Sequence, residues 1–258
     1  VFPTLAVQSD DEVLESWHTS NGTGFVITHT EADGTPRAVI FTHPGYSAYM
    51  GMNSHGLSLL WQTVADNAFA TDFCVPTMFV IREILEVATS VPDAIAMLHN
   101  FPHCVSNNFD FADAKGRLAS AEVGPGGRVS AMQTTGPYIV HTNEFLWDQW
   151  AIARQASVDP TSVARQTALR AFLNSTAAAG GFHSSLDSIQ NRYAKPPIFQ
   201  GSVGPPMQPT PAGIYTSVVL IFDVVGRTLH YLLPFEPTMT SYRHINIATR
   251  DHLAASDV

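Results

Sequence analysis

The chain has 258 residues, 45% of them hydrophobic and 14% charged, which is typical of one compact domain over residues 1–258. Its formal net charge of −9 argues against a nucleic-acid or anionic membrane partner, because both need clustered cations. No apolar run approaches the roughly 18 residues of a membrane-spanning helix, so the expected partners are small molecules or peptides.

Strand patterns fill most of the first 65 residues. A polar turn at 8–12 interrupts a weakly strand-like N-terminal segment. Two hairpins follow, with strands at 24–30 and 37–42 around an Asp-Gly turn at 33–34, and strands at 50–52 and 57–63 around a turn at 53–56. These strands are apolar at nearly every position, which predicts a sheet that is covered on both faces.

The apolar period becomes helical after Pro76. The pattern predicts one helix from Pro76 to about Val87 and a second from Ser90 to His99. Later elements are strands at 106–112, 118–123, 128–132 and 138–140, helices after Pro160 and at 186–193, a Pro/Gly-rich loop at 196–213, and a hairpin of 214–222 with 227–233. Segregated runs of this kind predict an α+β fold, with helices outside two layers of mainly antiparallel sheet.

The segment around Asn143 is the strongest candidate for a site. An apolar run at 138–140 is followed by His141, Thr142 and Asn143, three polar groups at the expected end of a strand. They can cap the strand end and satisfy local backbone groups. Alternatively, Asn143 can direct an amide N–H at an oxyanion, because a rigidly held amide needs no reorganisation when the charge develops.

Metal sites are disfavoured by the local sequence. His99 and His103 have a zinc-ligand spacing only if they share a helix, and Pro102 lies between them. Asp110 and Asp113 resemble part of a calcium loop, but a tight hairpin explains them better. We therefore expect no metal and no other cofactor.

Two cysteines, Cys74 and Cys104, are too few for a disulfide framework and leave the redox compartment open. Cys74 precedes a predicted helix, where the helix dipole would lower a thiol pKa, but a structural cysteine is the more common explanation. The sequons at Asn21 and Asn174 would accept glycans in a secreted protein. The chain is expected to be soluble, either secreted or cytosolic.

Four phrases, in order, resemble the acyl-CoA:6-aminopenicillanate (isopenicillin N) acyltransferase family of N-terminal-nucleophile (Ntn) hydrolases. They are Gly-Met-Asn-Ser-His-Gly-Leu at 51–57, the Cys-Val-Pro-Thr segment at 74–86, the Asn-Phe-Asp-Phe segment at 108–116, and His-Thr-Asn at 141–143. The resemblance covers nearly the whole chain. It implies a four-layer αββα sandwich and a mature chain that opens with a cysteine released by self-cleavage.

The resemblance also implies an activity and a set of residues. The cysteine, expected just upstream of Val1, would attack an amide or thioester carbonyl of a small acylated amine, amino acid or peptide, or of an acyl-CoA-type substrate, and form an acyl-enzyme. Asn143 matches the family's oxyanion-hole asparagine. His18 stands where the family has an aspartate, and Gln200 where it has an arginine. A cleaved N-terminal propeptide is the implied partner.

The substrate itself is not specified by any motif. Phe41, Tyr46, Tyr49 and Met50 follow the first predicted hairpin and are candidates for an apolar acyl pocket, with ordinary core packing as the alternative. The substitutions at His18 and Gln200 leave a second hypothesis, in which the chain is a non-catalytic relative that serves as a binding or structural module.

Overall fold

The structure is a computed structural model, and it describes residues 5–13, 25–30, 36–43, 45–64, 70–134, 138–148, 152, 160–178, 214–232 and 243–247. Its elements in chain order are β1 (Leu5–Val13), β2 (Phe25–Thr30), β3 (Pro36–Thr42), β4 (Met50–Asn53), β5 (Leu57–Thr63), α2 (Thr77–Val87), α3 (Val91–Leu98), β6 (Asn107–Asp113), β7 (Leu118–Gly124), β8 (Arg128–Thr134), α5 (Pro160–Ala178), β9 (Ile214–Asp223), β10 (Thr228–Leu232) and β11 (Arg243–Asn246).

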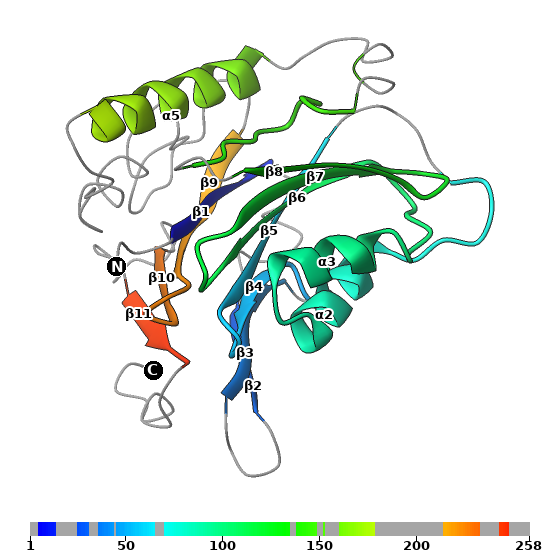
Figure 1. Ribbon diagram of the computed structural model, residues 1–258, viewed down its shortest axis with the longest axis horizontal. Helices are drawn as coiled ribbons and strands as arrows, with labels where there is room; N and C mark the ends of the chain where they lie inside the picture. Colours follow the sequence, from blue (N-terminus) through cyan, green and yellow to red (C-terminus); the bar gives the residue numbers. More distant parts are fainter. Residues whose placement is uncertain are drawn as a thin grey trace.

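The strands form two antiparallel sheets. The larger sheet runs in chain order from β2 to β8, and the smaller sheet has the order β1-β9-β10-β11. Figure 1 shows α2 and α3 on one face of the larger sheet, the smaller sheet on its other side, and α5 on the side away from α2 and α3. The predicted α+β sandwich of mainly antiparallel sheets is therefore confirmed.

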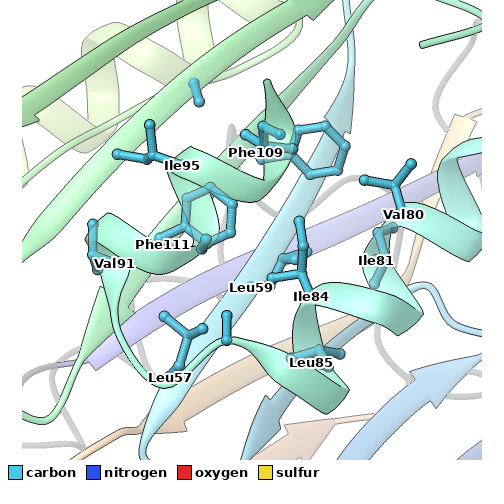
Figure 2. Packing of buried hydrophobic residues seen from close by; sticks show 14 of the residues in the cluster. Leu57, Leu59, Val80, Ile81, Ile84, Leu85, Val91, Ile95, Phe109 and Phe111 are labelled. Carbon is cyan, nitrogen blue, oxygen red and sulfur yellow. The ribbon is translucent and has the colours of Figure 1, made fainter. Parts of the chain in front are cut away.

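Both faces of the larger sheet bury apolar residues, as the strand composition predicts. In β3, Ala38 and Ile40 face the core under α2 and α3, whereas Val39 and Phe41 face the core between the sheets. The helix-side core is drawn in Figure 2, where Leu59 of β5 lies next to Ile84 of α2. The period-2 alternation of the strands thus fills two cores at once.

The two helices that cover the larger sheet, α2 and α3, begin and end where the sequence predicts. Ser90 caps α3, because its hydroxyl accepts a hydrogen bond from the Asp93 N–H at 3.4 Å. At the end of α2, the Asn53 amide donates to the carbonyls of Leu85 and Ala88 at 3.2 and 2.7 Å. None of the described helices is long and apolar enough to cross a membrane.

Three features differ from the sequence predictions. β1 continues through the expected turn at 8–12, because a register shift against β9 at Asp10/Asp11 absorbs the irregularity within an extended strand. Residues 138–140 form no regular strand; Val140 instead packs on Leu169 of α5. β11 was not predicted. The expected helix at 186–193 and the loop at 196–213 lie outside the described residues.

Candidate active site

Asn143 lies at the end of the larger sheet, between β5 and α5. Its side-chain amide donates a hydrogen bond to the Thr63 carbonyl at 3.0 Å, and its side-chain oxygen accepts one from the Arg165 guanidinium at 2.9 Å. Its backbone N–H donates to the Ser162 hydroxyl at 2.8 Å. Three contacts from two elements therefore hold this one residue.

The chemistry of these partners fixes which way the Asn143 carboxamide points. A backbone carbonyl can only accept a hydrogen bond, and a guanidinium can only donate. The oxygen must therefore face Arg165 and the nitrogen must face Thr63. The NH₂ group has a second N–H, which has no partner among the described residues. Within the described part of the chain, no acceptor therefore prevents this N–H from donating to an oxygen of a ligand.

The contacts from α5 were missed by sequence analysis. Ser162 is buried, accepts from the Asn143 backbone and donates to the Glu144 carboxylate. Arg165 follows it by three residues and so lies on the same helix face. This i, i+3 pair of polar groups on a predicted helix was the sequence feature that could have indicated a contact with Asn143. A surface helix normally carries such pairs, so the signal was weak.

Two of the four candidate pocket residues belong to the core between the sheets. Phe41 and Met50 are essentially inaccessible there, which fits the alternative of ordinary core packing. Tyr49 is half-buried, and its ring lies edge-on to Trp61 with 4.6 Å between the centroids. Tyr46 is 45% exposed and lies edge-on to Tyr49. The two tyrosines remain candidates for contact with a ligand.

These tyrosines lie at the same end of the larger sheet as Asn143. Trp61, on which Tyr49 packs, is two residues before Thr63, whose carbonyl holds the Asn143 amide. An aromatic surface and a fixed amide donor therefore share one end of the sandwich. The other proposed site residues, His18 and Gln200, lie outside the described residues.

The start of β1 lies at the opposite end of the sandwich. Leu5 pairs with Asp223, and the next residue, Val224, has its carbonyl 2.8 Å from the position of a Cβ on Gly56, just before β5 begins. Asn143 contacts Thr63, where β5 ends, roughly 20 Å away for a seven-residue strand. Leu5 and Asn143 therefore lie at opposite ends of the sandwich.

Cys74 and Cys104 form a disulfide, so Cys74 is a structural cysteine and not a reactive thiol, although the pairing itself was not predicted. The bridge joins the segment before α2 to the segment after α3, and the Val75 N–H donates to the Pro102 carbonyl beside it at 2.7 Å. Thirty residues separate the two cysteines, so their spacing in the sequence carried no sign of contact. Cys74 therefore has no free thiol for catalysis.

His103, next to this disulfide, is buried and has its Nε2 3.0 Å from the Leu98 carbonyl. Burial lowers the pKa of His103, and the nearby His99 adds to this effect, against the opposing hydrogen bond to Leu98. The contact with the Leu98 carbonyl at the end of α3 gives this histidine a structural role.

The hairpin explanation for Asp110 and Asp113 is confirmed. Asp113 ends β6, accepts backbone N–H groups from Val91, Lys115 and Arg117, and pairs with the Arg117 guanidinium at 2.6 Å. Asp110 accepts hydrogen bonds from the side chains of Gln62 on the neighbouring β5 and of Asn108 on its own strand. The two carboxylates thus serve the β6–β7 hairpin and its sheet.

Comparison of the sequence with protein families gives one match. The family model described as acyl-coenzyme A:6-aminopenicillanic acid acyl-transferase matches residues 21–198, which is more than half of the chain. No curated protein sequence matches the chain.

Solved structures share the fold at low sequence identity. Penicillin V acylase from Agrobacterium tumefaciens is 15% identical with a TM-score of 0.62, over 94% of this chain and 82% of that one. A mutant conjugated bile acid hydrolase from Clostridium perfringens is 11% identical with a TM-score of 0.58, over 95% and 85%. The N-acylethanolamine-hydrolyzing acid amidase orthologue of Caenorhabditis elegans is 11% identical with a TM-score of 0.57, over 87% and 93%. The fold is that of the Ntn hydrolases.

Proposed function

Because the chain belongs to the acyl-coenzyme A:6-aminopenicillanic acid acyl-transferase family, we propose that it is an amide hydrolase or acyltransferase for a small acylated amine, amino acid or peptide. Family members are amide hydrolases and acyltransferases that act on small acylated amines. The observation that carries the proposal for this chain is the fixed orientation of the Asn143 carboxamide, which leaves one N–H for an oxyanion.

The proposed nucleophile is the thiol of a cysteine upstream of Val1, released by cleavage of an N-terminal propeptide. Its α-amine takes the thiol proton, sulfur bonds to the substrate carbonyl carbon, and the carbonyl oxygen gains negative charge. The second N–H of Asn143 stabilises that oxyanion. The carbon–nitrogen bond then breaks, the amine leaves with the proton, and water or another amine accepts the acyl group. His18 is proposed to support the nucleophile.

Tyr46 and Tyr49 are proposed to bind the apolar part of the substrate, with Gln200 as a further contact. The support for this is their position at the same end of the sheet as Asn143 and the exposed fraction of Tyr46. Tyrosine side chains present a large apolar surface with a polar tip, so they suit an acyl group that ends in an aromatic ring or an alkyl chain.

Kinetics of an Asn143→Ala variant of the processed, full-length gene product test the proposal. Acylated amino acids and phenylacetyl amides are the substrates, and Asn100→Ala, an exposed asparagine beyond α3, is the matched control. Loss of one oxyanion donor lowers kcat by about 10²–10³-fold, with KM nearly unchanged. Equal kcat values in Asn143→Ala and the control would remove Asn143 from the mechanism.

A second candidate function is a non-catalytic binding or structural module. The position of Leu5, at the far end of the sandwich from Asn143, favours it, as do the departures at His18 and Gln200. This candidate predicts that the processed protein binds acylated amines without turning them over. If the processed protein turns over acylated amines, and substitution of the N-terminal cysteine abolishes this turnover, the binding-module candidate is excluded.

A further inference from the structure

Glu122 of β7 is a carboxylate with no solvent exposure inside the fold. Its neighbours in the strand, Ala121 and Val123, face the core under α2 and α3, so Glu122 points to the opposite face of the larger sheet. That side carries the segment 138–148, which includes Asn143. A buried carboxylate is costly unless hydrogen bonds replace its lost hydration.

Three of these partners are consecutive backbone N–H groups. Leu146 donates to one carboxylate oxygen, and Trp147 and Asp148 donate to the other, with 3.0 Å for Trp147. Segment 138–148 has no regular secondary structure, so no neighbouring strand accepts hydrogen bonds from these N–H groups. The Glu122 carboxylate accepts them instead. The carboxylate therefore holds the chain on the C-terminal side of Asn143.

The fourth partner is His141, on the N-terminal side of Asn143. Its Nε2 lies 2.9 Å from a Glu122 oxygen, and its Nδ1 lies 2.6 Å from the Thr142 carbonyl. Both ring nitrogens therefore lie within hydrogen-bonding distance of an oxygen, and the tautomer decides which of them donates. Glu122 thus closes a loop from residue 141 to residue 148 around Asn143.

We propose that Glu122 is a positioning residue for the oxyanion donor: it fixes the backbone on both sides of Asn143, so that the free amide N–H keeps one direction. This inference rests on the proposed function of the site. The side-chain contacts of Asn143 with Thr63 and Arg165 fix the rotation of the amide, whereas Glu122, together with the Ser162 hydroxyl that accepts from the Asn143 N–H, fixes where that amide sits. Oxyanion stabilisation requires both, because a displacement of about 1 Å costs about 10²-fold in rate.

A Glu122→Gln variant tests this, with Asp113→Asn as the matched control. Asp113 is also a buried carboxylate that accepts three backbone N–H groups, but it lies at the other end of the sheet. Glutamine keeps the size of Glu122 and replaces one acceptor oxygen with a donor. We expect kcat to fall by about 10²-fold with KM little changed in Glu122→Gln, and no such split in Asp113→Asn.

A second readout does not depend on activity. The side-chain amide signals of Asn143, assigned by NMR with the help of Asn143→Asp, are expected to shift and to exchange faster with water in Glu122→Gln, and not in Asp113→Asn. Unchanged Asn143 signals in folded Glu122→Gln would overturn the inference. Displaced signals in a protein whose wild type transfers no acyl group would keep the inference and reject the proposed function.

If Glu122→Gln does not fold, His141→Gln serves in its place. It keeps an N–H donor for Glu122 and loses the bond to the Thr142 carbonyl, so it loosens only one side of the loop. The same displacement of the Asn143 signals is expected, and its absence would overturn the inference in the same way.

Discussion

Removal of the Cys74–Cys104 disulfide is expected to lower the stability of the outer helical layer. The bridge closes a loop that contains both α2 and α3, and both cysteines are half-buried. A double substitution, Cys74→Ala with Cys104→Ala, leaves the flanking backbone bonds from Ala70 to the Cys104 carbonyl and from Val75 to the Pro102 carbonyl intact. The native geometry is therefore expected to survive, and the main change is in the unfolded chain.

The size of the effect follows from the loop that the bridge closes. The two cysteines are 30 residues apart. The chain-entropy relation for a loop of this length gives about 12 cal/mol/K, or about 3.6 kcal/mol of unfolding free energy at about 25 °C. This is a large share of the roughly 5–15 kcal/mol that holds a typical domain folded.

Urea unfolding of the wild type and the double variant, followed by circular dichroism, measures this loss. The wild type in reductant is the control, because it lacks the same bond and is expected to lose the same free energy. A loss below about 1 kcal/mol would refute the loop-closure reasoning. Two free thiols in the unfolded, unreduced wild type would refute the bridge itself.

Three further predictions concern the helical side of the larger sheet. Asn53→Ala leaves two carbonyls at the end of α2 without a donor, and is expected to cost about 1–3 kcal/mol in urea unfolding. Gly51→Ala places a Cβ 2.7 Å from Leu85 Cδ1, so we expect a loss of about 1–3 kcal/mol and a lower Tm. Burial lowers the pKa of His103, so as the pH falls below about 6.5 this histidine binds a proton more readily in the unfolded chain than in the folded one. The unfolding free energy therefore decreases in that range. A His103→Gln variant is expected to lose less unfolding free energy than the wild type between pH 7.5 and 5.5.

Local signals in the sequence were sufficient for the hairpins and the outer helices. The turn at 53–56 and the apolar runs beside it predict β4 and β5, and Ser90 with Pro92 predicts the start of α3. These elements depend on turn chemistry, caps and periodicity, all of which act within a few residues. The two-sided apolar strands also predict the two cores correctly.

Contacts that depend on distant residues could not be predicted in the same way. The apolar run at 138–140 has a strand-like composition, but it packs on Leu169 of α5, so tertiary packing overrides its local preference. Glu122 gave one signal, a carboxylate within a strand of small and apolar residues. Its partners, 19 to 26 residues later in the chain, were visible only in the folded protein.

The proposed cysteine nucleophile is tested most directly by mass spectrometry of the protein produced from its full-length gene and incubated with a phenylacetyl amide. We expect a processed chain whose first residue is a cysteine, with the phenylacetyl group on its sulfur after rapid acid quenching, and no adduct after iodoacetamide treatment. An unprocessed chain, or an acyl group on any residue other than that N-terminal cysteine, would contradict it.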